Sequence, residues 1–147
     1  MEKNFIKVRS VMDVVISGTL TIAGFVLITV PTSDPVNILG FIMIFTGVIL
    51  FLLLRSGYKD EVSGIRYCKT EHFFSQKERE QIADGLESKP ASISTSAEDK
   101  GSSLRLDVYH SKVTGKAYMQ LFEYIPYKYE PCSRQYEYSI SETGKLI

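Results

Sequence analysis

The residues in this chain with the most evident capacity for chemistry are two cysteines and two histidines. They are Cys68, His72, His110 and Cys132. Thiolate and imidazole groups bind zinc, and a cysteine beside a histidine can act as a nucleophile. However, neither a C-x-x-C nor an H-x-x-x-H spacing occurs. We therefore interpret all four as packing or surface residues, and expect no catalytic residue, no metal site and no cofactor.

Nucleotide and nucleic-acid chemistry is also not indicated. The chain contains no G-x-x-x-x-G-K-[ST], G-x-G-x-x-G, G-x-S-x-G or H-E-x-x-H motif, so the standard phosphate loops and hydrolase signatures are absent. Basic and acidic residues balance, with 17 of each. A domain that binds nucleic acid mainly through phosphates is usually basic, and we therefore expect no nucleic-acid partner.

Tyrosine is the most unusual residue type in the second half of the chain. Most of the nine tyrosines follow Lys116 and alternate with charged residues. Tyrosine gives a large contact area at low cost in side-chain entropy, which suits a protein-binding surface. We predict such a surface at Tyr127, Tyr129, Tyr136 and Tyr138. The alternative is ordinary sheet packing with the phenol groups in water.

Two apolar segments near the N-terminus must position everything else. No charge interrupts Val14–Val30 or Val36–Leu54, and each run reaches the roughly 17–25 residues that a membrane-spanning helix needs. Between them lies a turn at residues 31–35, in which two prolines stop one helix and start the next. We predict a transmembrane helical hairpin at residues 11–54, with the lipid bilayer as a partner.

The positive charges predict the orientation of this hairpin. The turn has no Lys or Arg, whereas basic residues flank both outer ends: Lys3, Lys7, Arg9, Arg55, Lys59 and Arg66. By the positive-inside rule, both termini are expected in the cytoplasm. We predict a multi-pass protein of the cell (inner) membrane with cytoplasmic N- and C-termini. A cleavable signal peptide is the competing interpretation, but no A-x-A-like site is evident.

Small residues on the two helices predict how the hairpin packs. They share one face of each helix and allow close backbone approach: Ser17, Thr21, Gly24, Gly40 and Gly47. Packing within the hairpin is one interpretation. Association between several copies is the other.

The rest of the chain predicts a small α+β domain. A capping box at Ser75–Glu78 indicates a helix over residues 76–87, and Leu104–Tyr109 alternates as a half-buried strand does. Further strands are expected near 65–69, 117–124, 127–130 and 135–140, with a frayed end at 141–147. The predicted fold is a two-helix transmembrane hairpin followed by one helix on a mainly antiparallel sheet, in the order β-α-β-β-β-β.

The predicted organisation is therefore a basic cytoplasmic lead-in at 1–10, a hairpin at 11–54 and a cytoplasmic α+β domain at 55–147. The leading functional hypothesis is a small, non-enzymatic inner-membrane protein that displays a protein-interaction domain, as an accessory subunit, adaptor or regulator. One alternative is an oligomeric, membrane-active or pore-forming component such as a toxin, immunity or defence protein. Another is a membrane-tethered enzyme that uses His72 or His110.

Overall fold

The computed structural model of this chain describes residues 2–30, 33–95 and 102–147. They form two compact units. The hairpin unit contains Ile6–Lys59, and the sheet unit contains Met1–Phe5 together with Asp60–Ile147. Residues 2–5, which belong to the predicted lead-in, thus group with the predicted C-terminal domain.

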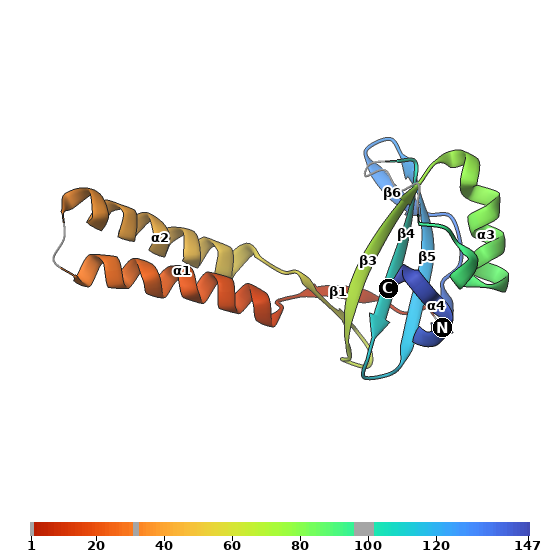
Figure 1. Cartoon of the computed structure of the whole chain (residues 1–147), viewed down its shortest axis with the longest axis horizontal. Helices are drawn as coiled ribbons and strands as arrows, with labels where there is room; N and C mark the ends of the chain where they lie inside the picture. The colour runs from red at the N-terminus through yellow and green to blue at the C-terminus, as the bar shows by residue number, and fades with distance from the viewer. Residues whose placement is uncertain (1, 31–32, 96–101) are drawn as a thin grey trace. The chain divides into compact units, whose positions relative to one another are not determined.

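The hairpin unit consists mainly of helices α1 (Val11–Thr29) and α2 (Asp34–Leu53), which lie side by side (Figure 1). Both are long and apolar enough to cross a membrane. In the predicted turn, Pro31 and Thr32 lie outside the described residues, and Pro35 occupies the first turn of α2. Proline is tolerated there because that backbone position has no hydrogen-bond partner to lose.

A buried aspartate joins the two outer ends of the hairpin. Asp13 forms a capping box with Ser10, whose backbone N–H donates to the carboxylate at 2.8 Å. The same carboxylate accepts from the Ser56 backbone N–H at 2.8 Å and from the Ser56 hydroxyl at 2.6 Å. Its side chain therefore caps α1 and also holds the chain just beyond α2.

Short strands lie at the base of the hairpin. Strand β1 (Phe5–Val8) pairs with β2 (Gly57–Asp60). An isolated two-stranded ribbon of this length has marginal stability in water, so the pairing of β1 with β2 depends on the packing of the segments that flank them.

The sheet unit is built on three long antiparallel strands. Strand β4 (Leu104–Ser111) lies between β3 (Arg66–Phe74) and β5 (Lys116–Ile125). Two short strands continue along the free side of β5. Strand β6 (Lys128–Pro131) pairs with its C-terminal half and β7 (Tyr136–Ser139) with its N-terminal half. The C-terminal antiparallel sheet with a helix is thus confirmed.

Short helical segments connect and follow these strands. Between β3 and β4 lie η1 (Gln76–Glu78), α3 (Arg79–Ser88) and η2 (Pro90–Ser92). The predicted capping box starts the first of them, with both reciprocal hydrogen bonds between Ser75 and Glu78 present. After β7 the chain ends in α4 (Ile140–Thr143) and η3 (Gly144–Leu146).

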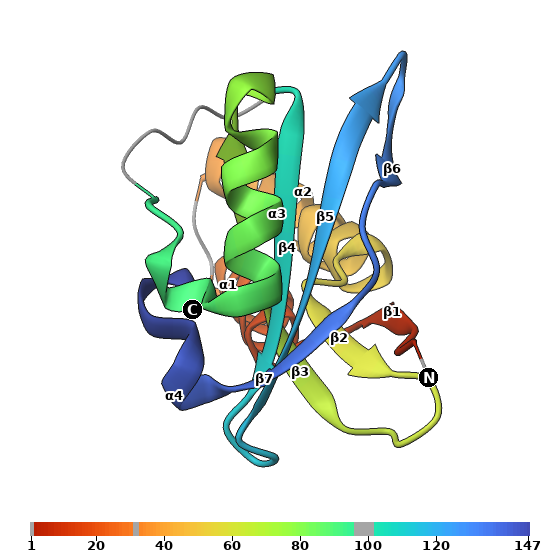
Figure 2. The same cartoon turned by 90° about the vertical axis from the view of Figure 1, so that its right-hand side faces the viewer.

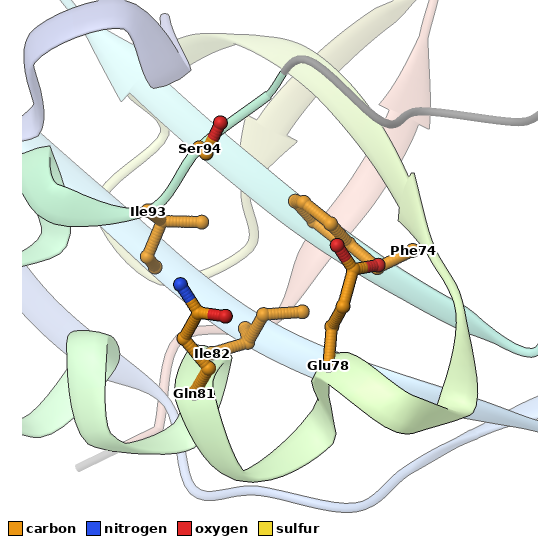
Figure 3. Close-up of a pocket in the computed structure, with 6 residues that line it drawn as sticks. All are labelled: Phe74, Glu78, Gln81, Ile82, Ile93 and Ser94. Atoms are coloured by element: carbon orange, nitrogen blue, oxygen red, sulfur yellow. The ribbon is translucent and has the colours of Figure 1, made fainter.

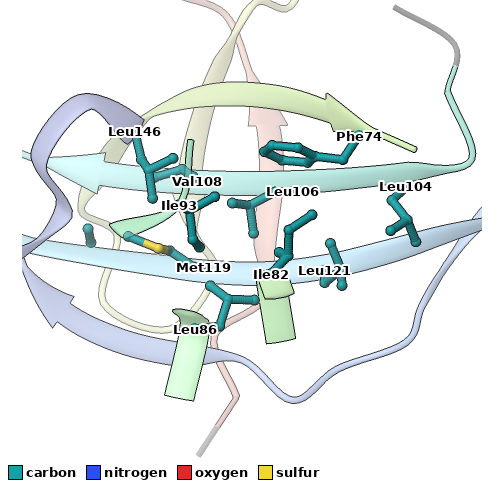
Figure 4. Close-up of a cluster of buried hydrophobic side chains, with 11 residues drawn as sticks. Phe74, Ile82, Leu86, Ile93, Leu104, Leu106, Val108, Met119, Leu121 and Leu146 are labelled. Carbon is teal, nitrogen blue, oxygen red and sulfur yellow. The ribbon is translucent and has the colours of Figure 1, made fainter. Parts of the chain in front are cut away.

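The core lies between the sheet and α3. Alternate side chains of β4, Leu104, Leu106 and Val108, are fully buried, as the period of a strand requires. Ile82 and Leu86 of α3 belong to the same buried cluster (Figure 4). Figure 2 shows α3 running alongside β4. One helix thus covers one face of the sheet.

The frayed end predicted for residues 141–147 is wrong. Thr143 and Leu146 are fully buried, and the Leu146 carbonyl lies 2.8 Å from Nε2 of His72. Burying a leucine side chain stabilises a protein by about 1.5–3 kcal/mol, which can hold a short terminal segment in place. A single apolar residue in a polar tail carries no periodic signal, so the sequence did not predict this contact.

Candidate interaction site

The face of the sheet opposite α3 is the main candidate for a functional site. Its side chains alternate with those of the core along β3, β4 and β5: Tyr67, Lys69, Glu71, Phe73, Arg105, Asp107, Tyr109, Tyr118, Gln120, Phe122 and Tyr124. We call this set the open face. The described segments α3, η2–Ile93 and η3 contribute side chains to the core cluster, so they cover the other face of the sheet.

The centre of the open face carries a cluster of opposite charges. The Asp107 carboxylate lies 2.8 Å from Nζ of Lys69 and 2.8 Å from Nε of Arg105. Lys69 also contacts Glu71 at 2.5 Å. The Asp107 side chain is only 2% exposed and that of Lys69 9%, whereas Glu71 is 38% exposed. The cluster is therefore closed at its base and open at Glu71.

Burial and ion pairing shift the pKa of Lys69 in opposite directions. Burial by itself lowers the pKa of Lys69, but its hydrogen bonds to Asp107 and Glu71 raise it, and the net pKa lies above the usual value. Lys69 is therefore charged at neutral pH. A buried charge without a partner is costly, so each member of this cluster depends on the others.

Aromatic rings surround one end of the charge cluster. Phe5 stacks on Tyr109 with ring centroids 4.0 Å apart, and meets the edge of Tyr67 at 5.0 Å. Tyr118 completes the group at 5.9 Å from Phe5, and burial raises its pKa to about 12, so the phenol stays protonated. Aromatic pairs in such geometries contribute about 0.5–1.5 kcal/mol each beyond their buried area.

Polar contacts hold the N-terminal segment at this end. Nζ of Lys3 lies 2.6 Å from the carboxylate of Asp60, whose side chain is fully buried. The Lys3 backbone N–H donates to the Gln135 side-chain oxygen at 2.7 Å. Burial by itself raises the pKa of Asp60, but the Lys3 and Ser63 hydrogen bonds lower it to about 2. These contacts explain why residues 2–5 group with the sheet unit.

The other end of the open face holds a second aromatic group. Tyr129 lies 5.2 Å from Tyr124 and 6.4 Å from Phe73, in edge-to-face geometry. The Arg105 guanidinium sits over the Tyr129 ring at 4.5 Å and over the Phe122 ring at 5.1 Å. Arg105 thus connects the charge cluster to this aromatic group through cation–π contacts.

The four tyrosines predicted to bind a protein do not form one surface. Tyr129 lies on the open face, and Tyr127 lies at the turn between β5 and β6. Tyr136 and Tyr138 pack against the core from the side of α3. The Tyr136 hydroxyl donates to Glu87 at 3.1 Å, and the Tyr138 hydroxyl donates to the Leu86 carbonyl. Strand pairing, which the sequence does not show, separates them.

Tyr127 has an unusual backbone. Ile125 pairs with Lys128, which leaves Pro126 and Tyr127 as a two-residue turn. Tyr127 has φ of 77° and is 97% exposed. A positive φ after proline fits the second central position of a type II turn, where glycine or asparagine is usual. For another residue this conformation costs about 1–2 kcal/mol.

The five small residues predicted to pack the helices all lie where α1 and α2 meet. A Cβ added at Gly24 would lie 2.6 Å from the Gly40 carbonyl oxygen, and one at Gly47 would lie 2.9 Å from the Ser17 carbonyl oxygen. These pairs run in opposite directions along the two helices, so the helices are antiparallel. Thr21 also faces Gly47, and its hydroxyl donates to the Ser17 carbonyl at 2.8 Å.

One glycine of α1 lies outside this contact. A Cβ at Gly18 would meet no atom within 4 Å. Gly18 borders an apolar groove of about 280 Å³ between the helices, which is lined also by Ser17, Thr21, Ile22, Val48 and Phe51. The groove is a surface on which a third apolar segment has room to pack.

The structure brings only one cysteine and one histidine of the four residues together as cross-strand partners. Cys68 is exposed and lies opposite His110 across β3 and β4. Burial lowers the pKa of His110, so its imidazole is neutral at pH 7, and its Nδ1 has no described hydrogen-bond partner. His72 and Cys132 lie elsewhere in the sheet unit. No cluster of three His, Cys, Asp or Glu side chains suitable for a metal occurs in the described ranges.

A small cavity beside α3 is not a ligand site. Side chains of Phe74, Ile82 and Ile93 surround it together with those of Glu78, Gln81 and Ser94 (Figure 3). Its volume of about 20 Å³ accommodates no more than a water molecule.

Some of the residues in these contacts carry a recognisable signal in the sequence, and others do not. Ser10 and Asp13 have the spacing of a capping box at the start of an apolar run. Asp107 occupies a polar position in an alternating strand, but such positions are usually exposed. Phe5 is an isolated aromatic residue, and nothing local to it indicates that it stacks on Tyr109.

The chain was also compared with known proteins. No protein-family model, curated protein or solved structure matches it.

Proposed function

We propose that this chain is a membrane-anchored, non-enzymatic protein that binds another protein, or a second copy of itself, through the open face. Helices α1 and α2 serve as the anchor. The basic residues that flank them support an orientation in the cell membrane with both termini, and hence the sheet unit, in the cytoplasm. The protein would then act as an accessory subunit, adaptor or regulator.

The observation that carries this proposal is the composition of the open face. In its charge cluster, the side chain of Asp107 is only 2% exposed and that of Lys69 only 9%. Both are this deeply buried although the described helices pack on the other face of the sheet. Around the cluster lie aromatic rings and Arg105, and aromatic residues and arginine are enriched at protein interfaces. Glu71 remains accessible at the centre. Such a surface offers a partner both apolar contact and one accessible charge.

The test is photo-crosslinking from two exposed glutamate positions in the membranes of cells that express the full chain. A photoreactive residue replaces Glu71 on the open face, and in a matched control it replaces Glu80 on α3. We expect an adduct of one defined mass from position 71 and none from position 80. An adduct of twice 16.6 kDa identifies a second copy. The absence of an adduct at 71, or the same adducts at both positions, contradicts the proposal.

A second candidate function is an oligomeric membrane component, and the groove beside Gly18 favours it. Helix packing in lipid depends on close contact at small residues, and Gly18 is not used within the hairpin. If copies associate at this groove, Gly18→Leu lowers the oligomer mass measured in detergent. Gly24→Ala is not a suitable control because it alters the hairpin itself. Thr46→Leu, at an exposed position of α2, serves instead.

A further inference from the structure

The turn between β5 and β6 projects apolar and aromatic side chains into solvent. Tyr127 is 97% exposed, Tyr124 50% and Ile125 42%. Lys128 follows, and it pairs with Glu130 while remaining 66% exposed. Tyr124 is supported at its base by the edge-to-face contact with Tyr129. We call residues 124–128 the hairpin tip.

Among residues 2–30, 33–95 and 102–147, no packing contact accounts for an aromatic residue at position 127. Tyr127 is the only non-glycine residue with positive φ in the described ranges, and the other positive-φ positions are glycines: Gly64, Gly115 and Gly144. Glycine would adopt this turn without strain. A side chain that is 97% exposed gains almost no contact energy in return. The described part of the chain thus supplies almost no contact that would offset the strain.

The chemistry of the hairpin tip matches the interface between lipid and water. Tyrosine places its ring among the headgroups and keeps its hydroxyl in a polar environment, and it is enriched at that depth. Ile125 adds apolar area, and Lys128 can extend its ammonium group toward phosphates and water. The mixture of aromatic, aliphatic and basic side chains is that of a shallow membrane contact.

The size of the tip favours a lipid surface over a protein partner. A stable protein interface needs about 800 Å² from each partner, and a two-residue turn with its neighbours offers far less. A lipid contact does not need high intrinsic affinity here, because α2 and β3 are joined by residues 54–65, which extend to at most about 43 Å. Because α1 and α2 already anchor the chain, this tether keeps the hairpin tip near the lipid surface. The effective concentration of lipid at the tip is therefore high.

We propose that the hairpin tip inserts Tyr127 into the headgroup region of the membrane that α1 and α2 span. This inference rests on the membrane anchoring in the proposed function, but not on the open face or its partner. The sheet unit is then held at the bilayer by a second, shallow contact in addition to its covalent connection.

Fluorescence quenching of single tryptophans tests the inference, because the chain contains no tryptophan. Full-length variants are reconstituted into phosphatidylcholine–phosphatidylglycerol vesicles whose acyl chains carry bromine, a contact quencher. Tyr127→Trp reports on the hairpin tip. Val113→Trp is the matched control, because Val113 is 89% exposed in the turn at the opposite end of β5. Phe45→Trp, at a 67% exposed position of α2, reports on the anchor.

We expect bromine near the headgroup end of the acyl chain to reduce emission from Tyr127→Trp at least about twofold, and bromine near the methyl end to act less. Val113→Trp should be unaffected, and Phe45→Trp should be quenched. Circular dichroism confirms folding of each variant, and the substitution at 127 exchanges one exposed aromatic residue for another.

Three outcomes would overturn the inference. If Phe45→Trp is quenched and Tyr127→Trp is not, the anchor stands and the tip contact is wrong. If Tyr127→Trp is shielded from acrylamide yet not quenched by bromolipid, a protein covers the tip instead. If Phe45→Trp itself is unquenched, the membrane anchoring fails, and the inference fails with it.

Discussion

At the scale of single residues, Tyr127 combines a strained backbone with an almost fully exposed side chain. Its positive φ is strained, and the described residues leave its side chain 97% exposed in return, so tyrosine is not the residue that folding favours at this position. Val113, another highly exposed side chain of the sheet unit, lies in a turn where Gly115 takes the left-handed position. A substitution of Tyr127 is therefore expected to raise the stability of the sheet unit, whereas most substitutions lower stability.

Tyr127→Gly should stabilise the sheet unit. Relief of about 1–2 kcal/mol of strain is partly offset by the extra freedom of glycine in the unfolded chain, which leaves a gain of about 0.5–1 kcal/mol. Denaturant unfolding of the full chain in detergent, followed by tyrosine fluorescence, measures the change. Val113→Gly, without strain to relieve, should not stabilise. A loss of stability in Tyr127→Gly would show that the side chain contributes to folding.

Asp60 should make the stability of the sheet unit depend on acid pH. Its folded pKa of about 2 lies below the ordinary value of 3.8, so the unfolded chain binds its proton first as the pH falls. The stabilisation is complete above about pH 4 and disappears as the pH falls through about 2. Asp60→Asn should reduce stability at pH 6 and flatten the acid dependence between pH 4 and 2. Asp84→Asn on the exposed side of α3 is the control, and equal effects of both substitutions would exclude a role for the Lys3–Asp60 pair.

At the scale of elements, the two helices of the hairpin depend on glycine where their backbones approach. Helix composition alone makes both segments apolar on all sides, so it does not select one face. The small residues select the contact face, because a side chain larger than that of glycine at position 24 or 40 would keep the two backbones apart. Gly18 offers a comparison within the same helix, since it has open space around its Cα.

Gly24→Ala should destabilise the hairpin by about 1–3 kcal/mol, because the new methyl group overlaps backbone atoms of α2 that have little freedom to move. Gly18→Ala should be neutral or slightly stabilising, since it adds a methyl group in open space within a helix. The loss of helical circular dichroism as sodium dodecyl sulfate is added to a mild detergent measures both. Equal effects of the two alanines would mean that α1 and α2 pack through another face.

At the scale of the whole molecule, the ends of the described chain contribute to the sheet unit. Residues 2–5 pack through Phe5 and Lys3, and the C-terminal segment packs through Leu146. Because residues 2–5 of the sheet unit precede the helices and Asp60 follows them, the apolar segments are in effect inserted near the start of the sheet unit.

The final two residues give a matched test of the C-terminal contact. Leu146 is fully buried and Ile147 is 37% exposed. Leu146→Ala should lower the stability of the sheet unit by about 2–5 kcal/mol, whereas Ile147→Ala should change it by no more than about 0.5 kcal/mol. Thermal unfolding followed by near-ultraviolet circular dichroism of the tyrosines distinguishes them. Similar melting of both variants would mean that the C-terminal turn is dispensable.

Features that depend on local composition and spacing were predictable from the amino-acid sequence. Uninterrupted apolar runs predicted α1 and α2, because spanning length and hydropathy are properties of a contiguous segment. The capping box at Ser75 and the alternation of Leu104–Tyr109 predicted a helix and a strand for the same reason. An antiparallel sheet with a helix in the C-terminal part of the chain followed from these local signals, whereas α4 and η3 did not.

Which distant residues share a surface depends on the pairing and packing of the strands, and the sequence did not predict it. Tyr129 and Tyr136 look equivalent in sequence, yet β6 and β7 pair with different halves of β5 and place them on opposite faces. A shift of one residue in register exchanges the faces of a strand, and register depends on contacts between segments far apart in the chain. The same holds for Phe5 on Tyr109, for Leu146 in the core and for the partners of Asp107. The candidate site is made of such long-range contacts, and that is why its elements were predictable and its surface was not.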